Sequence, residues 1–416
     1  MIAMTPDLSP RRRTTTSRID YYSALEASLR CDDVEGRRKV ERTILSVQGA
    51  HVETLDEDGS RRSMLNLCSN NYLGLAGSPI MSAAAKAGID TYGYGMSSVR
   101  FICGTQLPHR QLERRLADWL GAEAAILFPS CFDANAGLFE ALSNESDTIV
   151  SDALNHASIV DGIRLSKARR ARFPSGDIKA LERCLREAQG SRARFIVTDG
   201  VFSMDGVLAD LRAITALADR YEAFVIVDDS HAVGLIGPGG RGTPALHGVA
   251  ARVDLMTGTF GKALGGAAGG YVAGRAVLIE RLRQAARPYL FSNALPPVVA
   301  AATLSAIDLV EHADDLRAKL DDNTRFWRGA LGAAGFVLGG VDHPIAPVMI
   351  GDAVLAGQMA MELQARGIQV VNFAYPVVPK GQARLRTQLS AAHTTEDLAW
   401  AAKQFTEVGR NLGVVL

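Results

Sequence analysis

A single lysine, Lys262, stands among glycines, threonines and small apolar residues in the stretch DLMTGTFGKALGG, residues 254–266. An amine in such surroundings is costly to bury unless its pKa falls or it forms a covalent bond. Three interpretations compete: a loop that cradles a nucleotide phosphate, an exposed loop with a solvated lysine, and an amine that forms a Schiff base with an aldehyde cofactor. The local sequence leaves the last two open.

The phosphate-cradle interpretation fails on spacing. A P-loop requires the pattern G-x-x-x-x-G-K-[ST], in which the hydroxyl after the lysine binds magnesium. Here Gly258 lies too close to Gly261, and Ala263 follows the lysine. The GGAAGG at 265–270 does not match the dinucleotide pattern G-x-G-x-x-G, and it comes late in the order of predicted strands.

Further residues that could do chemistry follow other predicted strands. Asp228, in VDDSHAVG, could pair with a protonated pyridine nitrogen, and His156, in SDALNHAS, could stack on an aromatic ring. Ser130 and Asp133 resemble a capping box at a helix start, where free N–H groups suit a phosphate. Each feature alone has an ordinary structural explanation. Their occurrence at successive strand ends favours a ligand site there.

Two catalytic alternatives are weaker. Asp228, Ser230 and His231 might suggest a hydrolase triad, but adjacent strand residues face opposite ways and no G-x-S-x-G elbow exists in the sequence. Cys131 might be a nucleophile, but no general base is evident beside it. A packing and backbone role for Cys131 is therefore favoured.

Short apolar, β-branched runs alternate with helical patterns through the middle of the chain. The runs cover 124–130, 148–153, 194–200, 223–230, 254–260 and 269–274. Helical faces are formed by Leu112, Leu116 and Trp119 and, later, by Leu211, Ile214 and Leu217. This alternation predicts βαβ units and an α/β fold with a mainly parallel sheet that is buried on both sides.

Three regions are predicted along the chain. Residues 1–65 form an N-terminal arm, 66–300 a large domain and 301–416 a small C-terminal α+β domain. Within the arm, residues 1–20 are expected to lack regular structure, followed by a helix-permissive stretch from Tyr21 to about Glu41 and by strands around a DEDGS turn. The start MTPDLSPRRRTTTSR could be an organelle transit peptide, but a disordered tail is favoured.

The composition excludes several functional classes. Hydrophobic residues make up 47% and charged residues 22%, with a formal net charge of +0, so nothing indicates nucleic-acid binding. Near-zero charge leaves little repulsion against self-association. Five scattered cysteines without a C-x-x-C pair argue against disulfides and zinc and favour a reducing, cytoplasmic setting. No apolar run is long enough to span a bilayer.

Several long motifs resemble the α-oxoamine synthases, which are fold-type I enzymes that use pyridoxal 5′-phosphate. The motifs are NNYLGL, GMSSVRFICGTQLPHRQLE, SCFDANAGLFE, SDALNHASIVDGIRLSKA, TDGVFSMDG, VDDSHAVG, TGTFGKALGGAAGGY and RPYLFSNALPP. The resemblance covers residues 21–416. FICGTQ, SCFDAN and YPVVPKGQARLRTQLSAAHT are most similar to the branch that joins glycine and acetyl-CoA to 2-amino-3-oxobutyrate and CoA, a reaction whose reverse serves threonine breakdown.

The resemblance implies roles around the cofactor ring. Lys262 would hold pyridoxal phosphate as a Schiff base and later transfer protons. Asp228 would pair with the ring nitrogen, and His156 would stack on the ring face. His231 and Ser203 would hydrogen-bond to the phenolate oxygen of the ring.

It also implies the residues that bind the phosphate and the substrate. Thr259 and the backbone at Cys131 and Phe132 would reach the phosphate. Ser292 would reach the phosphate in the neighbouring subunit's site, which makes the enzyme a homodimer with shared active sites. The substrate carboxylate would be held by Asn71 and Arg386, whose planar guanidinium suits a two-pronged grip.

Two other functions remain open from the sequence. A paralogue could condense another amino acid or a longer acyl thioester, and the N-terminal extension and Leu107-Pro108 could mark such divergence. A non-catalytic partner subunit would keep only the scaffold. The joint presence of Lys262, Asp228 and Arg386 argues against that last alternative.

Overall fold

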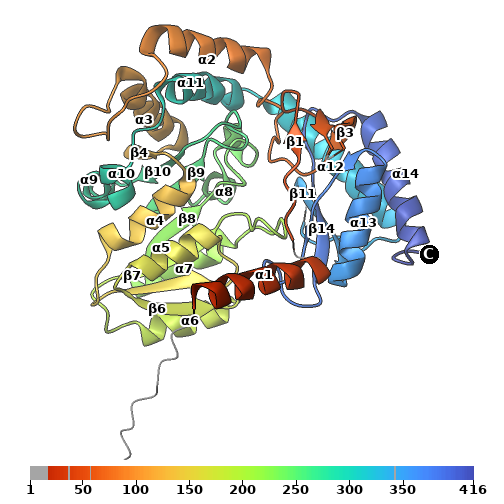
Figure 1. Ribbon diagram of the computed structural model, residues 1–416. Helices are drawn as coiled ribbons and strands as arrows, with labels where there is room; N and C mark the ends of the chain where they lie inside the picture. Colours follow the sequence, from red (N-terminus) through yellow and green to blue (C-terminus); the bar gives the residue numbers. More distant parts are fainter. Residues whose placement is uncertain (1–16, 36–37, 57, 342) are drawn as a thin grey trace, which may run out of the picture.

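The computed structural model describes residues 17–35, 38–56, 58–341 and 343–416. Its central element is a seven-stranded sheet in the order β4-β10-β9-β8-β7-β5-β6 (Figure 1). The strands are β4 (Ala124–Phe128), β5 (Thr148–Asp152), β6 (Arg169–Phe173), β7 (Arg194–Asp199), β8 (Phe224–Asp228), β9 (Leu255–Thr259) and β10 (Gly270–Gly274). β10 runs antiparallel to β4 and β9, while the other paired strands are parallel. The prediction of a mainly parallel sheet is confirmed.

Helices cover both faces of this sheet, and the strands place apolar side chains on both faces. Ile126 and Phe128 pack into one cluster with α4 (Cys131–Leu142), whereas Ala125 and Leu127 pack into another with α3 (Leu107–Leu120). The remaining helices of this part are α2 (Pro79–Tyr92), α5 (Ala157–Leu165), α6 (Ile178–Glu187), α7 (Leu211–Tyr221), α8 (Thr243–Leu246), α9 (Ala276–Ala285), α10 (Arg287–Phe291) and α11 (Pro297–Glu311). The predicted apolar faces of α3 and α7 are buried, which confirms the periodicity argument.

The sequence reasoning missed one strand of the sheet. β6 is an edge strand with the sequence RRARF, and it pairs with β5 in parallel. Phe173 is its one buried residue, because an edge strand with an exposed face needs little apolar surface. Such a strand contains no apolar run from which it could be predicted.

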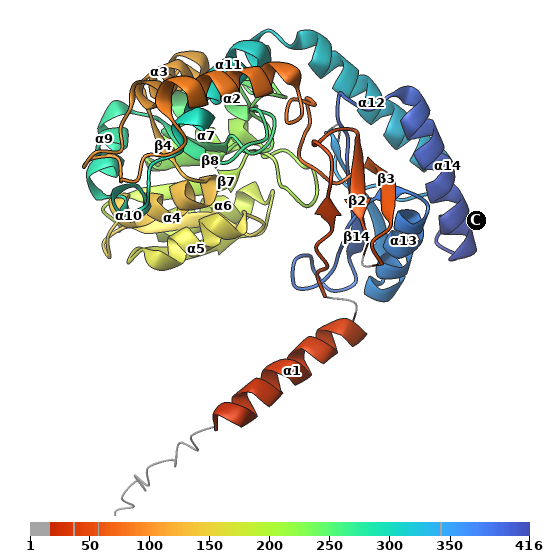
Figure 2. The same ribbon diagram turned by 45° about the horizontal axis from the view of Figure 1, so that its top comes forward.

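The C-terminal part forms a smaller α+β unit, as predicted. Its sheet has the order β11-β14-β13, with β11 (Ile345–Gly351), β13 (Asn372–Phe373) and β14 (Ala383–Gln388). Beside it lie α12 (Asp314–Ala333), α13 (Ala353–Ala365) and α14 (Thr395–Asn411) (Figure 2). A second sheet joins β1 (Thr43–Ile44), β2 (His51–Leu55) and β3 (Arg61–Asn66) to β12 (Ile368–Gln369). Strands from the two ends of the chain therefore pair directly.

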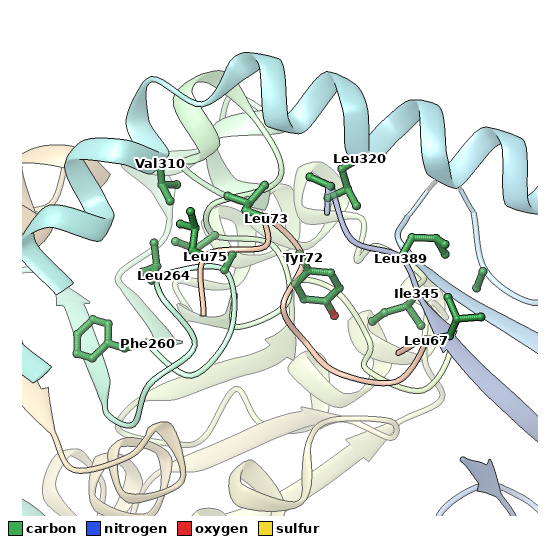
Figure 3. Close-up of a cluster of buried hydrophobic side chains, with 14 of the residues drawn as sticks. Leu67, Tyr72, Leu73, Leu75, Phe260, Leu264, Val310, Leu320, Ile345 and Leu389 are labelled. Atoms are coloured by element: carbon green, nitrogen blue, oxygen red, sulfur yellow. The ribbon is translucent and has the colours of Figure 1, made fainter. Parts of the chain in front are cut away.

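The segment after β3 connects the two parts. Leu67, Tyr72 and Leu73 lie in a cluster that includes Phe260 from the large sheet side and Ile345 from β11 (Figure 3). All five are nearly inaccessible to solvent. The motif NNYLGL is thus a buried wedge between the two parts.

The N-terminal helix α1 (Arg18–Val34) has no buried residue and projects from the rest of the protein (Figure 2). Ser17 caps it, and Asp20 completes a capping box. Residues 18–20 are therefore helical, which corrects the expectation that residues 1–20 lack regular structure. The possible transit peptide and tail fall largely on residues 1–16, which lie outside the described residues. No helix of the described chain is long and apolar enough to cross a membrane.

Candidate active site

A cavity of about 240 Å³ opens at the carboxyl ends of β7, β8 and β9, beside the first turn of α4. Its lining includes eight residues predicted from the sequence: Lys262, Asp228, His156, His231, Ser203, Thr259, Cys131 and Phe132. The other three, Asn71, Arg386 and Ser292, are not part of this lining. Parallel strands bring their carboxyl ends to one edge of the sheet, so residues far apart in the chain meet there.

Lys262 lies in the turn between β9 and β10, which starts at Phe260 and closes with a hydrogen bond from the Phe260 N–H to the Gly269 carbonyl at 3.0 Å. The turn contains Gly265 and Gly266 with φ of 99° and 75°, a conformation that favours glycine. Burial lowers the pKa of the Lys262 amine, although Asp228 opposes that shift. A lowered pKa makes the neutral, nucleophilic amine more accessible.

Asp228 is the last residue of β8 and is fixed by neighbours on both carboxylate oxygens. Asn135 Nδ2 donates to Oδ2 at 2.7 Å, and the Ser230 N–H donates to Oδ1 at 3.0 Å. Burial alone would raise the pKa of Asp228, but Ser230, Lys262 and Asn135 outweigh it and hold the pKa below its ordinary value. The carboxylate therefore stays negative next to the cavity.

His156 caps α5, and its ring borders the cavity. Ring Nδ1 lies 2.7 Å from the Ser158 hydroxyl, and the backbone N–H of His156 donates to Asp199 Oδ2 at 3.1 Å. Burial lowers the pKa of His156. The hydrogen bond to Ser158 fixes the orientation of the ring, and the lowered pKa keeps it neutral.

The part of the cavity lining at the start of α4 is rich in hydrogen-bond donors. Ser130 caps α4, so the N–H groups of Cys131 and Phe132 begin the helix without partners in the preceding turn. Thr259 Oγ1 lies nearby in the lining and donates to the Gly269 carbonyl at 3.2 Å. A helix N-terminus with a hydroxyl beside it suits a phosphate. Burial raises the pKa of the Cys131 thiol well above its ordinary value, which opposes a nucleophilic role.

Arg386, on β14, reaches the site from the C-terminal part. Its Nη1 donates to the Ser203 carbonyl at 2.9 Å, and its guanidinium lies over the Phe373 ring. With the Gln388 amide oriented to satisfy its neighbours, Gln388 Oε1 accepts from Arg386 Nη2 at 2.5 Å and from Nε at 3.0 Å. One oxygen therefore occupies the edge of the guanidinium that a carboxylate would take.

Asn71 and Ser292 differ in their surroundings. Asn71 is buried, and its Oδ1 accepts from the Ala76 N–H, but its Nδ2 has no partner among the described residues. A buried amide without a partner is costly and indicates a place for a ligand oxygen. Ser292 follows α10 directly, next to the exposed Phe291, and does not reach this cavity.

Several residues of the site were missed by the sequence reasoning. Asn135 and Ser230 hold Asp228, Tyr72 contacts His231, and Asp199 lies beside Asp228 in the register of β7 and β8. Asp199 ends its strand in TDG as Asp228 does in VDD, so the strand-end criterion could have found it. Burial and the charge of Asp228 hold the pKa of Asp199 well above its ordinary value. No local pattern marks Asn135, which lies inside a helix.

The group of side chains fits pyridoxal phosphate. An amine with a lowered pKa, an ionised carboxylate, a neutral imidazole and a helix N-terminus share one cavity. Asp199 Oδ1 lies buried beside them and has no hydrogen-bond partner among the described residues. Within the described part of the chain, no group of acidic, histidine or cysteine side chains could hold a metal ion.

The model of the family "Aminotransferase class I and II" matches residues 62–405. The chain belongs to this family. Among its relatives, the 2-amino-3-ketobutyrate coenzyme A ligase of Escherichia coli K12 is 54% identical over 398 residues, which is 95% of this chain and 99% of that protein. The human mitochondrial protein of the same name is 48% identical, with coverage of 97% and 96%.

The chain is also similar to other members of the family. The 8-amino-7-oxononanoate synthase of Thermosipho melanesiensis is 46% identical over 374 residues, which is 90% of this chain and 94% of that protein. The structure of serine palmitoyltransferase from Sphingomonas wittichii superposes with a TM-score of 0.90 at 31% identity, covering 96% of this chain and all of that one. These relatives confirm the resemblance to the α-oxoamine synthases.

Proposed function

We propose that this chain is an acyltransferase that joins glycine and acetyl-CoA to 2-amino-3-oxobutyrate and CoA, and that cleaves this product with CoA in threonine breakdown. The cofactor is pyridoxal 5′-phosphate. The decisive observation is that Lys262 and an ionised Asp228 line the same cavity. Identity of 54% to a 2-amino-3-ketobutyrate coenzyme A ligase along 95% of the chain supports the choice of substrates.

The residues around the cavity would have different roles toward the cofactor and the substrate. When bound, the cofactor supplies an electron sink for negative charge at the substrate's α-carbon. Asp228 would hold a proton at the ring nitrogen, and His156 would cover one ring face. Lys262 would form the covalent link to the aldehyde and would be placed to take a proton from the α-carbon of glycine.

The substrate carboxylate would bind at Arg386 and Asn71. The guanidinium edge of Arg386 already donates to an oxygen, that of Gln388. Asn71 Nδ2 is a donor without a partner among the described residues. A carboxylate could replace the Gln388 oxygen and give a stronger, charge-assisted pair. Holding the carboxylate in this way would also disfavour its loss as carbon dioxide.

The proposed enzyme is a homodimer in which Ser292 contributes to the partner's phosphate site. Ser292 lies away from its own chain's cavity and directly follows the exposed Phe291, and the segment after Ser98 carries the exposed Phe101 and Ile102. The Ala294 N–H donates to the Ser98 carbonyl, which brings these two segments together. Sedimentation should give a dimer. Mixing inactive Lys262→Ala and Ser292→Ala chains should restore part of the activity, and no recovery would contradict a shared site.

Borohydride reduction followed by peptide mass mapping tests the chemistry directly. The cofactor label should fall on Lys262. A label on another side chain, or none, would contradict the proposal. We also place the enzyme in the cytoplasm, since its five cysteines are unpaired, and cell fractionation would check this.

A paralogue with another acyl donor is the second candidate, supported by the similarity to an 8-amino-7-oxononanoate synthase. A panel of glycine, serine and alanine against acetyl-CoA and longer acyl thioesters separates the two. Glycine with acetyl-CoA should give the highest kcat/KM and the largest absorbance change of the bound cofactor. Preference for a longer thioester would favour the paralogue. A colourless protein would instead indicate a non-catalytic subunit.

A further inference from the structure

Tyr72 touches a residue of the cavity from outside the large sheet. Its ring is fully buried in the wedge that follows β3 (Figure 3). Its hydroxyl lies 2.8 Å from Nδ1 of His231. The two rings meet edge to face, with centroids 6.3 Å apart and an interplanar angle of 75°. His231 follows β8 and lines the cavity. Its Nδ1 is therefore occupied by the tyrosine, and among the described residues no hydrogen bond reaches Nε2.

His343 holds the backbone of His231 from the C-terminal part. The Ile345 N–H donates to Nδ1 of His343 at 3.0 Å, so the proton of this ring must sit on Nε2. That Nε2 lies 3.0 Å from the His231 carbonyl and donates to it. Burial lowers the pKa of His343 to about 4, which keeps the ring neutral. His231 is thus held by Tyr72 at its ring and by His343 at its backbone.

The position of the proton between Tyr72 and His231 follows from donor counting. The Tyr72 hydroxyl has no other hydrogen-bond partner in the described chain. If Nδ1 carried the proton and donated it to the tyrosine oxygen, the hydroxyl proton would be buried without an acceptor, which is costly. If the hydroxyl donates to a bare Nδ1, both groups are satisfied. Burial raises the pKa of Tyr72, so the hydroxyl keeps its proton.

A doubly protonated His231 is also disfavoured. Burial and the charges of Lys262 and Arg386 hold the pKa of His231 well below its ordinary value. The ring is therefore neutral and carries a single proton. With Nδ1 bare, that proton is on Nε2.

We propose that Tyr72 is a positioning residue that fixes His231 as the tautomer with its proton on Nε2, so that His231 offers an N–H donor to an oxygen anion in the cavity. This inference rests on the proposed function, in which His231 binds the phenolate oxygen of the cofactor. The opposite tautomer would present a lone pair to that oxygen and repel it. Tyr72 lies in the wedge between the two parts of the chain, so their packing sets a proton position in the site.

Neutron diffraction of the deuterated holoenzyme tests the tautomer without any substitution. Deuterium should appear on Nε2 of His231, and the Tyr72 hydroxyl should point to Nδ1. Deuterium on Nδ1 alone, or on both nitrogens, would overturn the proposal.

Tyr72→Phe tests the consequence, with Tyr271→Phe as the matched control. Tyr271 is equally buried, but its hydroxyl has no partner in the described chain, so its removal breaks no hydrogen bond. Tyr72→Phe should shift the absorbance spectrum of the bound cofactor and weaken cofactor binding about five- to tenfold, the effect of one hydrogen bond. It should lower kcat more than it raises KM for glycine. Tyr271→Phe should leave the spectrum unchanged.

The double variant with His231→Gln separates the proposed role of His231 from that of Tyr72. In that background Tyr72→Phe should have no further effect on the spectrum, because Tyr72 acts through His231. An additional shift would overturn the proposal. If His231→Gln itself changes neither spectrum nor cofactor affinity, the proposed role of His231 is wrong and the inference falls with it. If His231→Gln has an effect and Tyr72→Phe has none, the inference alone is wrong.

Discussion

The two sides of the candidate site are built in opposite ways. Around Asp228, neighbours from the large sheet and its helices hold both carboxylate oxygens. Around Arg386, the contacts cross between the two parts of the chain, and Gln388 Oε1 accepts at the guanidinium edge that we propose for the substrate carboxylate. Asn71, on the same side, keeps an Nδ2 donor that has no partner in the described part of the chain.

This difference separates preorganisation from substrate capture. A group that must hold a charge during the reaction benefits from partners that are fixed in advance. A group that must bind and release a substrate needs partners that can be exchanged. Substitutions on the sheet side should therefore affect mainly kcat, and substitutions on the β14 side mainly KM.

Lys262→Ala should have the largest effect, because in the proposed function it removes both the covalent link and the proton-transfer base. We expect a loss of at least about 10³-fold in kcat and no absorbance from a covalently linked cofactor. The exposed Lys403→Ala serves as the control and should retain full activity. Normal turnover by the Lys262 variant would refute the covalent role.

Asp228→Asn tests the sheet side, since it keeps the shape and removes the charge. Breaking a buried charge pair costs about 3–5 kcal/mol, which corresponds to roughly 10²–10⁴-fold in kcat. Steady-state kinetics should show this loss with KM for glycine little changed. Asp161→Asn, at an exposed ion pair with Arg164, controls for the loss of one carboxylate. If KM rises and kcat is preserved, the proposed division between the two sides is wrong.

Arg386→Lys tests the β14 side. Lysine keeps the charge but loses the two-pronged edge that Gln388 occupies, so kcat/KM should fall about tenfold to a hundredfold, mainly through KM. The same substitution at Arg366 should leave the kinetics unchanged. Arg366 pairs with Glu407 at 2.7 Å and is not part of the cavity lining. A loss confined to kcat would place Arg386 with the chemistry instead.

Gln388→Glu should have the smallest effect of these four substitutions. A fixed carboxylate would compete with the substrate for Arg386 and raise KM for glycine about tenfold, while kcat stays nearly unchanged. Gln404→Glu makes the same change beside Arg366, to which Gln404 is bonded at 2.8 Å, and should not alter KM. An unchanged KM in Gln388→Glu would show that this amide is not in the substrate's place.

Sequence reasoning succeeded where a pattern is local. The alternation of apolar runs and helical faces predicted the mainly parallel sheet, and the apolar periodicity identified the buried faces of α3 and α7. It failed for β6, because an exposed edge strand can be built from arginines. It also missed that strands β3 and β12 pair, since no sequence pattern states which distant strands meet.

For the site, local motifs predicted the reactive residue types: Asp228 ends β8, and His156 and Lys262 follow the ends of β5 and β9. The tertiary structure alone decided which neighbours tune them. Asn135 reaches Asp228 from a helix, and Tyr72 reaches His231 from the wedge between the two parts. The physical reason is that a pKa or a tautomer depends on burial and on partners a few ångströms away, and these distances are set by packing rather than by spacing along the chain.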